Sequence, residues 1–508
     1  MSTSILRNYS AKLFSKYCLR TTRNALLVVG SATLLSYPLW GNHHVSSETV
    51  TGIKQYTTES SDSENVSTIS LLSDKEVTQR LRQQEQSYYV QRGRRVIRYD
   101  VAQLPSNAPI EDNHVEQVIT VPGPDGQDDD LYFFGVFDGH GGPYTSSKLA
   151  KSLVPYVAHQ LSQVYTETNE TLTSDAVDSA FKNAFKNLDR DITEVSLGNL
   201  FSSPSKENLA QALPAISGAC ALLTMYDSMN STLKCAVTGD SRALLASVDE
   251  NGQWTVQSLS IDQTGDNPEE VDRIRSEHPG EPNVIRNGRI LGSLQPSRAF
   301  GDYRYKIKEI GGKTVADLPG HMKVYFRREP RDFLTPPYVT AEPVVTSAKV
   351  GQNSKFMVLA SDGLFELLSN EDVAALVIKW MEKNKVTPFA KTLAASGPQA
   401  KLPSVTDISE YKEAQRPAFR YRSKQKNAAE YLMEDSNVST HLIRNALSAR
   451  GNKEYVSTLV SIPSPMSRKY RDDLTVTVVF FGGEEDLSHV DGQLLLNHDA
   501  TAGLEPKL

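Results

Sequence analysis

Residues 131–142 read LYFFGVFDGHGG, an apolar run that ends in an aspartate and a glycine-rich turn. Leu131 to Phe137 have the length and the aromatic and β-branched content of a buried strand. Asp138 therefore stands at the exit of a strand, and His140 follows between two glycines. These polar side chains have little to pack against, so we expect this strand end to carry chemistry.

Two later stretches repeat the pattern of an aspartate beside a buried strand. In KFMVLASDGLFE, residues 355–366, the predicted strand 356–360 is followed by Asp362. In RDDLTVTVVFF, residues 471–481, Asp472 and Asp473 precede the predicted strand 474–481. The exit of one antiparallel strand lies beside the entrance of its neighbour, so we expect Asp362 and Asp472 to be adjacent.

A fourth stretch, APIED at residues 108–112, adds Glu111 and Asp112 near a proline-restricted turn. Clustered carboxylates repel one another unless a cation neutralises them, and hard divalent cations take oxygen ligands. The sequence therefore predicts that five acids meet in one metal site: Asp138, Asp362, Asp472, Glu111 and Asp112.

The composition limits the classes of protein that fit. At 508 residues, with 39% hydrophobic, the chain can bury a large core, and we expect one large catalytic domain. A net charge of -7 argues against a nucleic-acid partner, because binding a phosphate backbone requires an excess of cations. Cys18, Cys220 and Cys235 are not spaced as a disulfide framework or a zinc cluster.

The N-terminus has the composition of a mitochondrial targeting segment. Residues 1–47 contain no acid, while Lys and Arg recur among Ser, Thr and apolar residues. Within them, residues 25–40 are mostly apolar but slightly short of the ~20 residues that cross a bilayer. They fit either an inner-membrane anchor or sorting signal, or an apolar part of a cleaved presequence.

The remaining boundaries follow from shifts in composition. Residues 48–87 are predicted to be a linker, residues 88–484 the catalytic domain and residues 485–508 a C-terminal tail. The last three residues, Pro506-Lys507-Leu508, differ from the S-K-L peroxisomal address in their first position. A peroxisomal address and a chance tripeptide both remain open.

Helical periodicity is clear in two places. Apolar residues recur at helical spacing over 174–191, and Ser369 to Asp372 form a capping box ahead of a predicted helix over 373–385. Sustained periodicity is absent from three segments, which are predicted to be insertions or lids: 193–215, 303–337 and 386–425.

Two more strands are predicted over 219–226 and 233–246. The second is interrupted at 238–241 by Thr-Gly-Asp-Ser, which favours a tight hairpin turn and puts Asp240 at another strand end. The acidic run at 125–130 lacks the glutamate of a calcium-binding loop, and we expect it to be a hairpin turn before the strand that starts at Leu131.

Several motifs occur in one order along the chain: Glu111-Asp112, DGHGG (138–142), SGACALL (217–223), TGDSRALL (238–245), RAFGD (298–302), SDGLFELL (361–368) and RDDLTVTVV (471–479). Together they resemble the metal-dependent type 2C protein Ser/Thr phosphatases over residues 100–483. Four segments are most similar to the pyruvate dehydrogenase phosphatase branch: LPSNAPIED (104–112), DNPEEVDRIRSEHP (266–279), LGSLQPSRAFGD (291–302) and PPYVTAEPVV (336–345). The resemblance implies an α+β fold, a central sandwich of two antiparallel sheets with helices on both outer faces, which agrees with the predicted elements.

The resemblance also implies two Mg²⁺ or Mn²⁺ ions in the active site. Asp138 would bridge them. Asp362 and Asp472 would complete the protein ligands of one ion, and Glu111 with the carbonyl of Gly139 would serve the other.

Further acids would act around these ligands. Asp112 would not touch an ion and would orient a metal-bound water as part of the catalytic machinery. Asp240 and Glu366 would form a weaker third metal position, although many relatives have Asp where this chain has Glu366.

The implied reaction is hydrolysis of phosphoserine or phosphothreonine by direct attack of a water that bridges the two ions. The alkoxide is a poor leaving group, and a histidine that titrates near neutrality suits its protonation. His140 is therefore the candidate general acid, with a capping or ligating histidine as the alternative. Most relatives have an arginine four residues before the Glu-Asp pair, whereas this chain has Asn107, which suggests an amide donor to the substrate phosphate.

Other arginines are weaker candidates for a role in phosphate binding or catalysis. Arg92, Arg94, Arg95 and Arg98 would add phosphate attraction, but a charged run beside a strand is more often a solvated face. Arg298 and Asp302 are expected to form a buried ion pair that fixes the adjacent loop.

These observations predict a mitochondrial phosphoprotein phosphatase, in the matrix or the intermembrane space, with a pyruvate dehydrogenase subunit as the implied substrate. Membrane association would depend on residues 25–40. A catalytically silent module that binds partners is the alternative, and the complete set of acids argues against it. A two-metal nuclease is a further possibility from the chemistry alone, but this sequence shows no basic groove for a nucleic acid.

Overall fold

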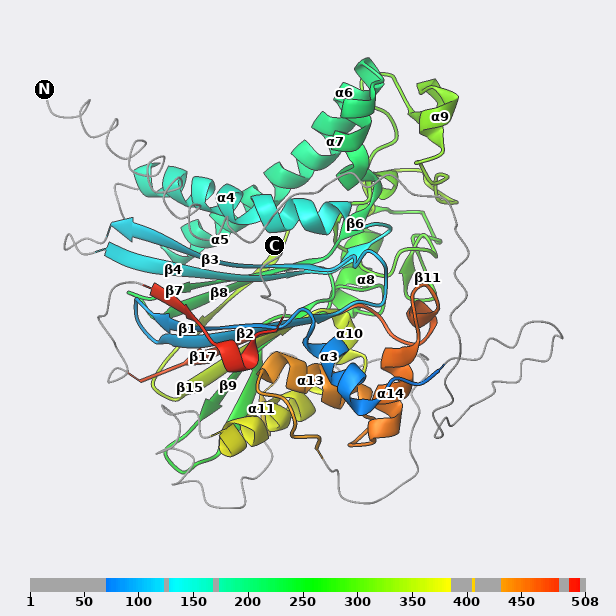
Figure 1. Cartoon of the computed structure of the whole chain (residues 1–508). Coiled ribbons are helices and arrows are strands. Elements are labelled where there is room, and N and C mark those ends of the chain that lie inside the picture. Colours follow the sequence, from blue (N-terminus) through cyan, green and yellow to red (C-terminus); the bar gives the residue numbers. More distant parts are fainter. Residues whose placement is uncertain are drawn as a thin grey trace, which may run out of the picture.

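The computed structural model describes residues 70–122, 128–167, 173–384, 404–406, 431–483 and 493–502. Two β-sheets lie face to face, and helices cover both outer surfaces (Figure 1). The predicted α+β sandwich is therefore confirmed.

The larger sheet has eight strands in the spatial order β16 (Ser404–Thr406), β10 (Trp254–Ser258), β9 (Arg242–Val248), β15 (Ser354–Ala360), β17 (Leu474–Phe481), β2 (Val96–Leu104), β1 (Gln86–Gln91) and β18 (Gln493–Leu496). Its neighbouring strands are antiparallel except β10 and β16, which run parallel.

The second sheet has the order β14 (Val344–Lys349), β8 (Thr232–Thr238), β7 (Ala221–Asp227), β4 (Asp128–Phe137) and β3 (Asn113–Pro122). All of its pairs are antiparallel. Two small sheets lie beside it: β13 (Phe300–Gly301), β6 (Gly218–Ala219) and β5 (Gly139–His140), and the pair β11 (Ile285–Arg286) and β12 (Arg289–Ile290).

The apolar runs of the central strands are explained by burial on both faces. In β15, Phe356 and Val358 belong to the core under the helices, whereas Met357 and Leu359 belong to the core between the sheets. Successive side chains of a strand point to opposite faces, so a strand buried on both sides needs no polar alternation.

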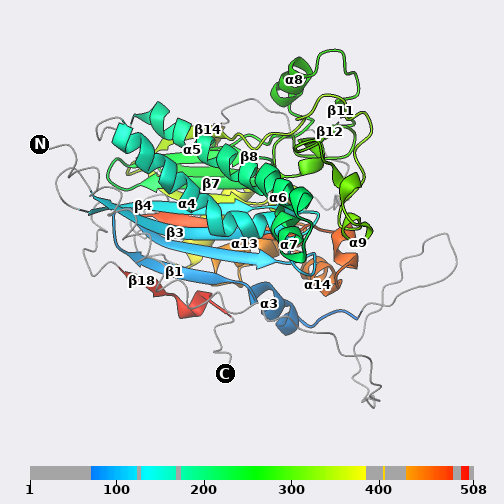
Figure 2. The same ribbon diagram turned by 90° about the horizontal axis from the view of Figure 1, so that it is seen from above.

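The outer surface of the five-stranded sheet is covered by α4 (Tyr144–Glu167) and α5 (Ser174–Arg190). The π-helical turn η1 (Asp191–Val195), α6 (Ser196–Ser202) and α7 (Lys206–Ile216) continue from α5 and extend the same apolar core. In the view from above, α4 and α5 lie over its strands (Figure 2). The eight-stranded sheet is covered by α3 (Asp74–Arg82), α11 (Asn370–Asn384), α13 (Val438–Leu447) and α14 (Lys453–Ser461).

Short helices occupy the connections: α8 (Pro268–Glu277), η2 (Tyr303–Tyr305), η3 (Val315–Asp317), α9 (Gly320–Lys323), α10 (Asp362–Phe365), η5 (Met466–Lys469) and η7 (His498–Ala500). The predicted helix over 174–191 is confirmed as α5. The predicted capping box is also confirmed, since Ser369 Oγ accepts from Asp372 N at 3.1 Å and the Asp372 carboxylate accepts from Ser369 N at 3.4 Å.

The packed structure extends beyond both predicted ends of the catalytic domain. Helix α3 lies inside the expected linker, yet it buries Val77 and Leu81 in the main core and starts at a capping box between Ser73 and Glu76. Strand β18 lies inside the expected tail and pairs with β1. Each segment is anchored by only a few apolar residues, so the mainly polar composition around them resembled that of a linker or a tail.

Two further segments differ from what their local sequence suggested. The turn at 238–241 is not a hairpin, because β8 and β9 belong to different sheets and the chain crosses between them there. Residues 193–215, predicted as an insertion or lid from their lack of periodicity, are mostly helical: η1, α6 and α7 run through them and bury Leu197, Leu200 and Leu209.

Several predictions fall outside the described residues: the targeting segment with its apolar part 25–40, most of the insertion at 386–425, and the tripeptide 506–508. Among the helices of the described ranges, none is long and apolar enough to span a bilayer.

Candidate metal centre

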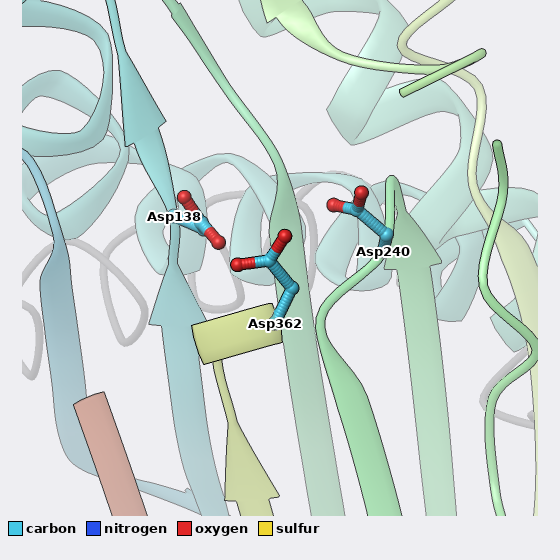
Figure 3. Close-up of side chains that lie close together, drawn as sticks. All are labelled: Asp138, Asp240 and Asp362. Atoms are coloured by element: carbon cyan, nitrogen blue, oxygen red, sulfur yellow. The ribbon is translucent and has the colours of Figure 1, made fainter. Parts of the chain in front are cut away.

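Three aspartates meet at one end of the sandwich. Asp138 follows β4, Asp240 lies in the turn between β8 and β9, and Asp362 begins α10 directly after β15. Each offers a carboxylate oxygen that lies within 4.8 Å of the other two, and the side chains point toward one another (Figure 3). Oxygen donors at this spacing suit Mg²⁺ or Mn²⁺.

The electrostatics of the group favour a cation. Burial, followed by the charges of Asp112, Asp362 and other acids, raises the pKa of Asp138 well above its ordinary value. Burial and then Asp362 raise the pKa of Asp472 to about 7, although Arg468 opposes this rise. Acids that resist ionisation because of their neighbours are the pattern expected of metal ligands in the absence of positive charge.

The predicted neighbourhood of Asp362 and Asp472 is confirmed. Strands β15 and β17 pair antiparallel, with Ala360 opposite Val476, so the exit of one lies beside the entrance of the other. Asp472 forms an ion pair with Arg468 of η5. Its charge is therefore partly neutralised by the chain itself.

Glu111 is held at the site by a loop that Asp473 organises. The buried Asp473 carboxylate accepts hydrogen bonds from the backbone N–H groups of Ser106, Asn107 and Glu111. Glu111 in turn accepts from the backbone N–H of Gly142 at 2.5 Å, which ties it to the turn after Asp138. No role was predicted for Asp473, and the only sequence feature that pointed to it is its place as the second acid of the RDD motif.

The side chain of Asn107 links two carboxylates in this loop. Its amide nitrogen donates to Glu111 Oε2 at 3.1 Å and to Asp473 Oδ2 at 3.2 Å. Both amide hydrogens are thereby directed at carboxylates, so a contact from this amide to substrate would require one of these bonds to be exchanged.

Two neighbouring residues are fixed by close packing. A side chain at Gly139 would overlap the carbonyl oxygen of Glu111, which explains the glycine there. Asp112 is buried and accepts from Thr475 Oγ1 at 2.7 Å. Burial, then Asp473, raises the pKa of Asp112 well above its ordinary value.

His140 is oriented by an acid that lies far away in sequence. Its Nε2 lies 2.6 Å from Asp302 Oδ2, and the pair fits only because Gly218 has no side chain that would overlap both groups. Asp302 adopts the left-handed conformation with φ 49°, a strained backbone for a residue other than glycine. Burial disfavours the imidazolium, but Asp302 outweighs burial and raises the pKa of His140.

The predicted ion pair between Arg298 and Asp302 was wrong. Arg298 instead binds the buried carboxylate of Glu270 in α8, with Nη2 to Oε1 at 2.6 Å. A side chain's direction in an irregular loop depends on tertiary contacts, which the motif RAFGD does not encode.

The arginines near β2 also have partners away from this site. Arg92 pairs with Asp130 at 2.7 Å, and Arg98 pairs with the buried Asp100 at 2.7 Å. They stabilise the sandwich, so supplementary phosphate attraction by them is not supported.

Of the two acids expected at a third metal position, only Asp240 lies within the group of three carboxylates. Asp240 joins Asp138 and Asp362 directly, and it accepts from the thiol of Cys220 at 3.1 Å. Glu366 caps the C-terminal end of α10, where its backbone N–H donates to Asp362 O at 2.8 Å, and it is not a member of the three-carboxylate group.

Comparison with known proteins gives consistent results. Residues 106–399 match the family model for protein phosphatase 2C. The chain is 56% identical over 519 residues to the mitochondrial pyruvate dehydrogenase (acetyl-transferring) phosphatase 1 of Saccharomyces cerevisiae, covering 96% of this chain and 90% of that protein. It is 39% identical to a protein phosphatase 2C homolog of Schizosaccharomyces pombe, covering 80% of this chain and 84% of that protein. It is 30% identical to the mitochondrial pyruvate dehydrogenase phosphatase 1 of Bos taurus, covering 78% of this chain and 79% of that protein.

Proposed function

The chain belongs to the protein phosphatase 2C family, a metal-dependent family of protein serine/threonine phosphatases, and we propose that its substrate is a phosphorylated subunit of mitochondrial pyruvate dehydrogenase. Support for the substrate comes from the names of two relatives that match along most of their length. The same names support a mitochondrial location, with the matrix favoured by that substrate. Attachment to the inner membrane through residues 25–40 remains a prediction.

The metal ligands we propose are Asp138 as the bridge between two ions, Asp362 and Asp472 on one ion, and Glu111 with the Gly139 carbonyl on the other. The observation that carries this proposal is the convergence of acids from separate strand ends, with carboxylate oxygens of Asp138 and Asp362 within 4.8 Å of each other. Bound Mg²⁺ or Mn²⁺ would lower the pKa of water and neutralise phosphoryl charge.

Asp240 lies close enough to Asp138 and Asp362 to extend this ligand set, and we propose it as the protein ligand of a weaker third position. Glu366 has less support there, because it does not belong to the group of acids whose carboxylate oxygens lie within 4.8 Å of one another. Asp112 would act through a hydrogen bond to water rather than by direct ligation.

His140 is proposed to protonate the leaving serine or threonine oxygen. Asp302 occupies Nε2, so the proton would come from Nδ1, and the same carboxylate stabilises the imidazolium that holds it. Asn107 is retained as a substrate contact only through exchange of its present hydrogen bonds, and the structure favours a role in positioning Glu111.

The substrate assignment can be tested with the purified full chain and phosphorylated pyruvate dehydrogenase complex. We expect phosphate release that requires Mg²⁺ or Mn²⁺, stops with EDTA and is much faster than release from phosphorylated casein. Equal rates on both phosphoproteins would overturn the substrate assignment while leaving the phosphatase assignment intact.

A silent binding module of the same fold is the second candidate. It is disfavoured because the sequence contains every acid expected at the two-ion site and because His140 is paired with Asp302.

A further inference from the structure

The arginine side chains around the candidate metal centre differ in whether an acid already binds them. Arg468 pairs with Asp472, and Arg298 pairs with Glu270. Asn107, at the position where most relatives have an arginine, directs its amide at Glu111 and Asp473. A phosphoryl dianion would need a further donor, because a charged hydrogen bond to phosphate is stronger than a neutral one.

Arg327 is such a donor. A methyl group on Gly141 would lie 3.4 Å from Arg327 Nη2 and 3.7 Å from its Cζ, so the guanidinium lies directly over the turn after Asp138. Gly141 and Arg327 are both exposed, and Arg327 has no hydrogen bond or ion pair to any residue in the described part of the chain. Gly141 follows His140 and precedes Gly142, whose N–H binds Glu111.

The segment that carries Arg327 is anchored to the same loop as the His140 partner. Phe326 packs edge-on against Tyr303, with ring centroids 5.5 Å apart, and Tyr303 directly follows Asp302. Met322 is buried in the core beneath α4 and α5. Arg327 is therefore held near His140 by packing, although the guanidinium itself is free to bind a ligand.

We propose that Arg327 binds the phosphoryl oxygens of the substrate through its guanidinium fork, an inference that rests on the proposed function. The fork offers parallel N–H donors that match two oxygens of one phosphate. This role would give residues 303–337, predicted as an insertion or lid, a direct part in substrate binding.

The test compares Arg327→Ala and Arg327→Lys with Arg328→Ala, the matched control, because Arg328 is also exposed and is the next residue. Calorimetric titration of the Mn²⁺-loaded full chain with inorganic phosphate reports binding without turnover. We expect Arg327→Ala to weaken phosphate binding about tenfold or more, Arg327→Lys to weaken it less, and Arg328→Ala to change it less than about twofold.

Kinetics on two substrates locate the contact. Loss of the phosphate contact should raise KM about tenfold for both p-nitrophenyl phosphate and a phosphoserine peptide, with kcat nearly unchanged. A rise confined to a peptide with acids beside phosphoserine would place Arg327 on those carboxylates and overturn the proposal. Phosphate binding by Arg327→Ala equal to that of Arg328→Ala would also overturn it, whatever substrate the wild type prefers.

Discussion

Replacing Asp138 by Asn should stabilise the metal-depleted protein while removing its response to metal. With carboxylate oxygens within 4.8 Å, each ionised pair repels by about 3.5 kcal/mol at an effective dielectric constant of 20. Asp138 forms two such pairs, with Asp240 and Asp362, so full ionisation would cost about 7 kcal/mol. Proton binding by Asp138 relieves this cost at low pH, so about 7 kcal/mol is the upper limit of the stabilisation by Asn, which is approached only as the wild-type carboxylate ionises.

The sign of the pH dependence follows from the raised pKa of Asp138, caused by burial and then by its acidic neighbours. The folded protein holds this proton more tightly than the unfolded chain, so stability of the metal-depleted wild type is lost as pH rises from the unfolded value through the folded one. Asn does not ionise. The advantage of Asp138→Asn should therefore grow as pH rises.

The assay is urea unfolding in EDTA and in excess Mn²⁺, at several pH values. Manganese should stabilise the wild type, because a ligand that binds only the folded state shifts the equilibrium, and it should stabilise Asp138→Asn much less. Asp100→Asn is the control, since this buried carboxylate is satisfied by Arg98 and its loss should destabilise the protein in both conditions. If Asp138→Asn is less stable than wild type in EDTA at every pH, the reasoning is refuted.

Three further predictions concern His140, Glu270 and His441. His140→Ala should slow hydrolysis of phosphoserine more than hydrolysis of an aryl phosphate, because a good leaving group needs less acid; equal losses in kcat would contradict the acid role. Burial raises the pKa of Glu270, but hydrogen bonds from Arg298 and Arg273 outweigh burial and lower this pKa to about 2. The ionised carboxylate therefore adds about 3 kcal/mol to the free energy of unfolding above pH 4.5, its pKa in the unfolded chain, and this contribution is lost as pH falls toward 2. Glu270→Gln should lower stability at neutral pH and flatten the acid-unfolding curve measured by circular dichroism. Burial lowers the pKa of His441 to about 4, so the neutral ring stabilises the fold above pH 6.5 and this stability is lost as pH falls through 4. His441→Gln should reduce that loss, and an unchanged pH profile in urea unfolding would contradict it.

The sandwich and most of the acids were predictable because local signals encode them. The strands that end at Asp138 and Asp362 are continuous apolar runs, and the antiparallel rule alone brought Asp362 beside Asp472. The order of the motifs carried the resemblance to the family, and that resemblance predicted helices on both outer faces of the sandwich.

The partners of polar side chains were less predictable, because they depend on long-range geometry. Asp302 was expected to bind Arg298, four residues away, yet it binds His140 across a glycine that leaves room for both groups. The turn at Asp240 has hairpin-like residues but crosses between sheets, since a local turn sequence does not specify which sheet receives the next strand. Asp473 braces a loop that lies more than three hundred and sixty residues earlier in the chain.

The most direct test of the central claim is phosphate release from a phosphoserine peptide by the full chain, titrated with Mg²⁺ or Mn²⁺, for wild type and Asp138→Asn. We predict metal-dependent release by the wild type, abolished by EDTA, and a loss of several orders of magnitude in the variant at saturating metal. Near-normal turnover by folded Asp138→Asn would contradict the assignment of Asp138 as the bridging ligand.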